Sequence, residues 1–231
     1  MKTIGLLGGM SWESSLEYYR IINEKVKNEL GGLHSSKSIL YSVDFEEIEV
    51  LQHQNKWEEL TVIMINAAKS LEKAGADMVL ICTNTMHKMA DDVQKNISIP
   101  LVHIADATAQ AIQQQGLKKI GLLGTKFTME QDFYKGKLLE KYGIDVVIPN
   151  DTDREIVHKV IYNELCLGEI KDSSKKEYIR IIENLVRDGA EGIILGCTEI
   201  PLLVKQTDVS VPVFDTTTIH AENAVMKAIE K

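Results

Sequence analysis

The chain has 231 residues, of which 44% are hydrophobic and 26% charged, and its net charge is −8. This length and composition are typical of a globular protein with one large domain or two small ones. No Lys/Arg cluster indicates a nucleic-acid surface, and no apolar run approaches the roughly 18 residues of a membrane span. Three cysteines without framework spacing, and an apolar N-terminus too short for a signal peptide, predict a cytoplasmic protein.

The first hundred residues alternate short apolar runs with amphipathic stretches, which is typical of a parallel sheet flanked by helices. Residues 3–7 predict a buried strand that ends in glycines. Apolar residues then recur at helical spacing from Leu16 to Leu30, and Gly31 ends that helix. The other elements expected in this half of the chain are strands at 39–43, 78–81 and 101–104, a helix at 57–73 and a helix after Asp106.

The second half of the chain has the same alternation. It predicts strands at 120–123, 145–148, 192–195 and 213–214. Helices are expected at about 128–142, 153–167, 174–187 and 219–229.

The two halves also share motifs in the same order. KTIGLLG at residues 2–8 returns as KIGLLGT at 119–125, and AGADMVLICTN at 74–84 returns as DGAEGIILGCTE at 188–199. The offsets at the first glycine, at the cysteine and at a later proline are 116, 115 and 112 residues (Gly5 and Gly121, Cys82 and Cys197, Pro100 and Pro212). Constant order and near-constant spacing indicate two copies of one unit.

We therefore predict an α/β protein of two pseudo-symmetric, flavodoxin-like lobes with parallel sheets and an active site in the cleft between them. The first lobe is expected at residues 1–100 and the second at 101–212, with residues 213–231 packing back on the first lobe.

A cysteine follows the third strand of each copy, and ligands of parallel sheets gather at the carboxyl ends of the strands. If the lobes face each other, Cys82 and Cys197 approach one cleft from opposite sides. Inverting a stereocentre removes a proton from one face and delivers another to the opposite face, a task that a thiolate and a thiol can share. A single buried cysteine is usually a small core residue, but the duplicated position favours catalysis. Cys166 has no counterpart and is interpreted as core or cleft wall.

Other chemistries have less support. The glycine turn at residues 5–11 lacks the spacing of a phosphate loop; it is either an anion-binding turn, with Met10 and Ser11 nearest the ligand, or a tight strand-to-helix connection. The histidines lack metal-ligand spacing, Lys88 stands where a cysteine phosphatase has its arginine, and no lysine has the context of a pyridoxal site. We expect no metal and no cofactor.

GLLGGMS at residues 5–11, CTNTMH at 82–87 and GCTE at 196–199 resemble the aspartate/glutamate racemase family over essentially the whole chain. Residues 42–45, 104–108 and 214–216 look like the bacterial branch that is specific for L-aspartate and L-glutamate or has broad specificity. The resemblance implies a cofactor-independent homodimer that interconverts L- and D-amino acids with Cys82 and Cys197 as paired acid and base. The substrate contacts that it implies are Met10, Gln52, Thr83, Asn84, Thr85, Thr125 and Thr198.

The sequence departs from the family in two places that concern the substrate. Aspartate racemases carry an arginine after the second strand and a lysine in the second lobe, whereas residues 43–47 read VDFEE and Cys166 aligns with the lysine. A neutral polar side chain such as that of homoserine then fits as well as aspartate. Two alternatives stay open: another cysteine-dependent isomerase or lyase, such as maleate cis–trans isomerase or malonate decarboxylase, and a non-catalytic amino-acid-binding protein. A decarboxylase of that type keeps only one of the two cysteines, so the presence of both Cys82 and Cys197 counts against it.

Overall fold

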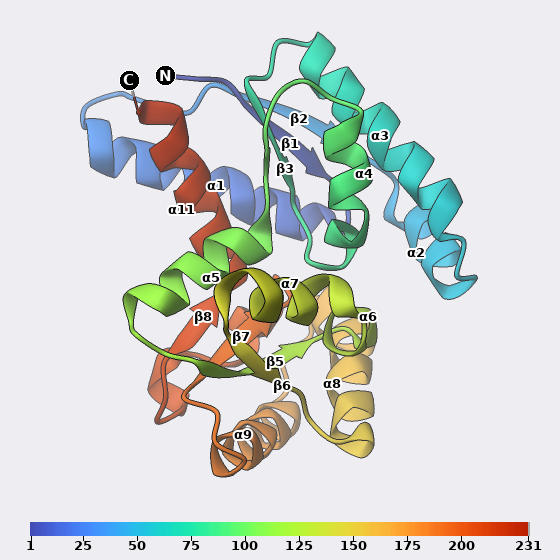
Figure 1. Ribbon diagram of the computed structural model, residues 1–231, viewed down its shortest axis with the longest axis vertical. Coiled ribbons are helices and arrows are strands. Elements are labelled where there is room, and N and C mark those ends of the chain that lie inside the picture. The colour runs from blue at the N-terminus through green and yellow to red at the C-terminus, as the bar shows by residue number, and fades with distance from the viewer. Residues whose placement is uncertain (231) are drawn as a thin grey trace. The chain divides into compact units, whose positions relative to one another are not determined.

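The computed structural model describes residues 1–230. Over this range the strands form two four-stranded parallel sheets with the orders β2-β1-β3-β4 and β6-β5-β7-β8, joined by helices (Figure 1). Both orders are that of a flavodoxin-like sheet, in which the chain turns in opposite directions from a central pair. The prediction of two repeated flavodoxin-like α/β folds is therefore confirmed.

The first sheet contains β1 (Ile4–Gly8), β2 (Ser38–Ser42), β3 (Met78–Ile81) and β4 (Leu101–Val102). Its connecting elements are α1 (Trp12–Leu30), α2 (Phe45–His53), α3 (Trp57–Lys73), the short 3₁₀ helix η1 (Thr85–Met89) and α4 (Ala90–Lys95).

The second sheet contains β5 (Lys119–Gly124), β6 (Asp145–Val147), β7 (Gly192–Gly196) and β8 (Val213–Asp215). Its helical elements are α6 (Lys126–Glu130), α7 (Asp132–Tyr142), α8 (Asp151–Asn163), η2 (Leu165–Leu167), α9 (Asp172–Arg187), α10 (Ile200–Leu203) and η3 (Gln206–Asp208). One further helix follows the last strand of each sheet: α5 (Ile104–Gln114) follows β4, and α11 (Thr216–Ile229) follows β8.

The core of the first sheet follows from the alternation of side chains along its strands. Val79 and Ile81 of β3 pack into a cluster with α2 and α3, whereas Met78 and Leu80 point to the other face. That second face packs against α1 and against the alanine-rich side of α11. Apolar burial on both faces explains why the strand reads as an uninterrupted apolar run.

The turn from β1 to α1 requires glycine. Gly9 has a φ of +91°, and a Cβ atom there would collide with the Val43 carbonyl oxygen. Ser11 then caps α1 by accepting a hydrogen bond from the Ser14 backbone N–H, and the Ser15 hydroxyl accepts one from Gly9 N–H at 2.8 Å. Small residues therefore bring the helix start close to the end of the strand.

Buried tyrosines connect the helices of the second sheet in pairs. Tyr178 of α9 donates to the Val157 carbonyl of α8 at 2.9 Å, and Tyr134 of α7 donates to Thr108 of α5 at 3.3 Å. Burial raises the pKa of both phenols, so they remain neutral donors.

The contacts group the described residues into two compact units: Met1–Ile104 with residues 220–230, and Ala105–Ile219. The strand Val213–Asp215, which we expected to return to the first lobe, instead pairs with β7. Only the later part of α11 joins the first unit, because its alanine face fills the core there.

Several element ends differ from the predictions. The helix expected at 128–142 is divided into α6 and α7 by the extended backbone of Gln131, and the one expected at 153–167 ends at Asn163 before η2. The helices α2, α4 and α10 were not predicted. Among residues 1–230, no helix combines the length and apolar character that a membrane crossing requires.

Candidate active site

The turn after β1 carries the first predicted contact, Met10. Its side chain is 5% exposed and packs in the same cluster as Met64 and Met86. Ser11, the other residue expected near a ligand, is also buried and serves as the helix cap.

Gln52 lies on α2 and is 4% exposed. Its amide nitrogen donates to the Met86 sulfur at 3.1 Å, and its buried carbonyl oxygen has no hydrogen-bond partner within residues 1–230. A buried acceptor of this kind is costly unless a donor reaches it, which a bound molecule can supply.

Cys82 lies in the hydrophobic core of the first unit. Its side chain is fully buried on the face of β3 that packs against α1 and α11, and its Sγ is 3.9 Å from the Leu80 carbonyl oxygen. Burial raises the pKa of the Cys82 thiol well above its ordinary value. A thiol in such surroundings is held neutral and unreactive.

Thr83 and Asn84 connect Cys82 to η1, which begins at Thr85; Thr83 is partly exposed and the other two are buried. His87 of η1 fixes this segment. The Ile104 backbone N–H donates to His87 Nε2 at 3.1 Å, so Nδ1 carries the proton and donates to the Thr83 carbonyl at 2.8 Å. His87 thus orients the residues at the strand end.

Cys197 and Thr198 follow β7 and are both partly buried. The Cys197 thiol donates to Glu199 Oε2 at 2.9 Å, and the Thr198 hydroxyl donates to the same oxygen at 2.6 Å. Burial, the negative charge of Glu199 and the neighbouring Cys166 raise the pKa of Cys197. The motif predicts no role for Glu199, although an acidic residue two positions after the cysteine is visible in the sequence.

Thr125 lies after β5 and is buried. Its hydroxyl caps α6 by accepting from the Thr128 N–H at 3.2 Å, which repeats the arrangement of Ser11 and α1. The predicted residues therefore form two groups at the carboxyl ends of the strands, one in each unit.

The strand register determines which residues of the two units correspond. Leu7 of β1 pairs with Ile81 of β3, and Leu123 of β5 pairs with Leu195 of β7. Leu7 and Leu123 occupy the same place in the repeated IGLLG motif, so Ile81 corresponds to Leu195.

One residue further along, Cys82 corresponds to Gly196, and Thr83 corresponds to Cys197. The equivalence of Cys82 with Cys197 that the sequence repeat suggested is thus off by one residue. In the first unit, the position that carries a thiol in the second unit is occupied by a hydroxyl.

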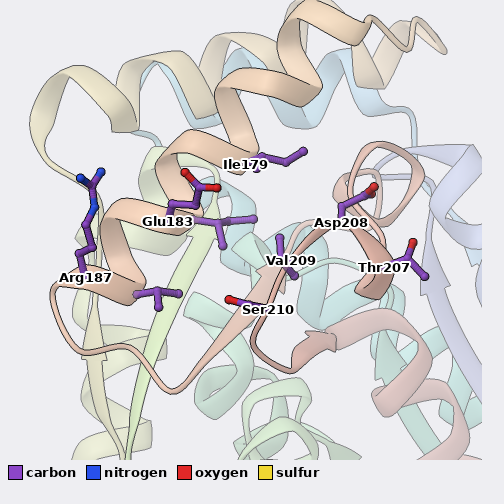
Figure 2. A pocket seen from close by; sticks show the side chains of 9 residues that line it. Ile179, Glu183, Arg187, Thr207, Asp208, Val209 and Ser210 are labelled. Carbon is purple, nitrogen blue, oxygen red and sulfur yellow. The ribbon is translucent and has the colours of Figure 1, made fainter.

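A separate groove of about 610 Å³ lies in the second unit between α9 and residues 207–210 (Figure 2). Its lining includes Glu183 and Arg187 of α9 and Asp208, and it lies near the amino ends of β7 and β8. Cys197 follows the carboxyl end of β7, so this groove is not the predicted site. Within residues 1–230, no group of three or more His, Cys, Asp or Glu side chains is arranged to hold a metal ion.

The structure is that of an α/β protein with two repeated parallel sheets, and its small polar residues, glycine turns and Cys197 lie at the carboxyl ends of the strands, where ligands of such sheets bind. The chain belongs to the Asp/Glu/hydantoin racemase family, whose model matches residues 7–224. Membership of this racemase family indicates that the chain is an isomerase.

The chain is similar over its whole length to a Yersinia pestis protein whose crystal structure is described as that of a candidate Asp/Glu racemase (59% identity, TM-score 0.94, 100% of both chains). An aspartate racemase homologue from Pyrococcus horikoshii OT3 shares 42% identity, with a TM-score of 0.85 and 100% of both chains covered. The broad-specificity amino-acid racemase RacX of Bacillus subtilis (strain 168) is 24% identical over 96% of both chains.

Proposed function

We propose that the protein is a cofactor-independent racemase of polar amino acids in which the Cys197 thiol exchanges the α-proton. The observation that carries this proposal is the strand register, which makes Cys197 and Thr83 counterparts after the third strand of each repeat. Two corresponding groups suit a reaction in which one face of a carbon loses a proton and the other face gains one.

In the proposed reaction, the Cys197 thiolate removes the α-proton of one enantiomer and leaves a carbanion. The opposite face then takes a proton from the Thr83 hydroxyl or from a water molecule that this hydroxyl holds, and bulk water restores that proton. A thiol ionises near pH 8.5, whereas an aliphatic hydroxyl does not ionise in the range of the side-chain acids, so the Thr83 side is the weaker base.

This reaction differs from the predicted pair of Cys82 and Cys197. Cys82 is fully buried among apolar side chains, and Thr83, not Cys82, corresponds to Cys197. We therefore assign the second position to Thr83 and give Cys82 a packing role.

The proposed substrates are aspartate, glutamate and related polar amino acids such as homoserine. The names of the relatives support amino acids of this kind, and RacX supports broad specificity. We propose that the substrate is held by the small polar side chains and by Gln52, whose carbonyl oxygen suits an ammonium donor. The proposed contacts are Met10, Gln52, Asn84, Thr85, Thr125 and Thr198.

We also propose a homodimer that works in the cytoplasm. Trp12, Leu16 and Tyr19 lie on one side of α1 and are 65%, 54% and 51% exposed, which supports contact with a second copy. The proposed location in the cytoplasm is supported by the free cysteines, which fit a reducing compartment. Light scattering should give about twice the chain mass, and Trp12→Glu should give the mass of one chain; a monomeric wild type would refute the dimer.

The deciding experiment is α-proton exchange in deuterated water, followed by NMR, with both enantiomers of aspartate, glutamate and homoserine and no added cofactor. One enantiomer should exchange faster than it inverts, because Cys197 can return a deuteron to the face from which it took the proton. The other enantiomer should exchange only as fast as it inverts. Cys197→Ser should abolish both processes.

The absence of exchange with every amino acid tested would overturn the racemase proposal. Incubation with maleate would then test the cis–trans isomerase, and calorimetry with the same amino acids would test a binding protein. A binding protein would retain its affinity in the Cys197→Ser variant.

A further inference from the structure

Glu199 is a buried carboxylate beside the thiol of Cys197, the proposed reacting group. Its side chain is 6% exposed, and its Oε2 accepts from the Cys197 thiol at 2.9 Å and from the Thr198 hydroxyl at 2.6 Å. A carboxylate is costly to bury unless donors such as these satisfy it.

The first unit has a different residue at this position. The strand register makes Thr83 the counterpart of Cys197. Two residues further along each chain segment, Thr85 is therefore the counterpart of Glu199. The second unit therefore carries a thiol–carboxylate pair where the first carries two hydroxyls. If the turn after the third strand required a carboxylate, both units would have one. Because only the unit with the thiol has it, we attribute the carboxylate to the thiol.

We propose that Glu199 is the proton acceptor for Cys197 and so makes its thiolate available for catalysis. This role rests on the proposed racemase function. The S–H bond of Cys197 breaks, its proton forms an O–H bond with Glu199 Oε2, and the thiolate then takes the α-proton of the substrate. The pair carries a single negative charge before and after the internal transfer, so no proton is lost to bulk water.

The surroundings of the thiol make such an acceptor necessary. Burial raises the pKa of Cys197, so loss of its proton to water at neutral pH is unfavourable. The other titratable groups near it, Cys166 of η2 and Tyr178 of α9, are weaker acceptors than a carboxylate, and η2 packs against α10, which begins just after Glu199. A base next to the reacting group is the usual way to activate a side chain that is inactive at its own pKa.

The test measures how alkylation of Cys197 by iodoacetamide depends on pH, in the full-length protein without substrate, by mass spectrometry of the Cys197 peptide. The wild type should react at a rate that is independent of pH between about pH 6 and 8, because Glu199 takes the proton. In Glu199→Gln, which keeps the shape and an acceptor oxygen, the rate should rise about tenfold per pH unit, because only the thiolate reacts. Glu164→Gln is the matched control, since Glu164 is bound by Ser174 and Lys171 in the same unit.

α-Proton exchange is measured on the same three proteins. Glu199→Gln should lower kcat by about 100-fold or more, with KM changed less than threefold and the same slope with pH. A wild-type alkylation rate that already rises tenfold per pH unit, with the Gln variant merely shifted to lower pH, would overturn the proposal and leave Glu199 a purely electrostatic neighbour. Failure of the racemase function would instead appear as no exchange in any protein, with the alkylation profiles still informative.

Discussion

Cys82 in the first sheet occupies the position that Gly196 occupies in the second. Cys82 directly follows β3 and Gly196 is the last residue of β7, but only Cys82 extends a side chain into the core between its sheet and the covering helices. Cys82, which the sequence motif suggested as a catalytic thiol, thus packs in the hydrophobic core.

This packing role predicts that Cys82→Ala keeps its activity. The variant should lose about 1–2 kcal/mol of stability through the small cavity left by the sulfur. Its rate of α-proton exchange should stay within about threefold of the wild type, because the altered atom faces the core. NMR exchange and urea unfolding measure the two effects. A folded Cys82→Ala protein without exchange would return Cys82 to the catalytic role.

A second thiol at the corresponding position should change the balance between exchange and inversion. In Thr83→Cys, each face has a thiol, so the enantiomer that exchanges slowly in the wild type should exchange at least about 10-fold faster. The rate at which that enantiomer inverts should rise together with its rate of exchange. Exchange that is unchanged for that enantiomer, in a variant with a wild-type melting temperature, would show that residue 83 does not face the substrate.

The buried histidine of α11 predicts a loss of stability in acid. Tyr18 donates to His220 Nδ1 at 2.8 Å, and His220 Nε2 donates to the Val102 carbonyl at 2.7 Å, so the ring is neutral. Burial lowers the pKa of His220 from 6.5 to about 4. The unfolded chain therefore binds a proton that the folded one does not, and the stability present above pH 6.5 is lost as the pH falls towards 4.

The size of that loss is at most about 3.5 kcal/mol, because a difference of one in pKa corresponds to about 1.4 kcal/mol. Urea unfolding of the wild type and His220→Asn at pH 7.5 and 4.5 isolates this contribution. The variant is expected to be less stable at pH 7.5 but to lose less stability on acidification. Equal losses in both proteins would assign the acid sensitivity to other groups.

The turn after β1 should not tolerate a side chain. Gly9→Ala combines a positive φ with a collision against the Val43 backbone, and should cost about 4 kcal/mol. Gly75→Ala is a matched control with a φ of +96° and no atom within 4 Å of the added Cβ, so it should cost about 1–2 kcal/mol. Thermal unfolding compares them, and equal costs would contradict the steric explanation.

Local sequence patterns predicted those parts of the fold that depend on local periodicity. The helix Trp57–Lys73 has the bounds expected from its apolar spacing, and the strand Met78–Ile81 was recognisable as an apolar run between glycine and polar residues. The break at Gln131 was missed because apolar spacing continues through it and only the backbone angle changes.

The correspondence of the proposed catalytic positions was harder to predict because it depends on pairing between distant strands. Cys82 and Cys197 each precede a threonine, so an alignment by residue identity joins them. The pairing of Leu7 with Ile81 and of Leu123 with Leu195 instead makes Thr83 correspond to Cys197. The residue types do not reveal which strands pair or in which register. Similarly, Glu199 is visible in the sequence, but its contact with the thiol is not.

The path of α11 has a consequence for the order in which the protein can fold during synthesis. Ala221, Ala224, Val225 and Ala228 fill the core of the first unit, although they follow all of the second unit along the chain. A nascent chain that has emerged as far as β8 has every strand of both sheets, yet the helix that covers one face of the earlier sheet is still missing. The second unit can therefore complete its core on the ribosome before the first, and the part of the protein made earliest is the last to be closed.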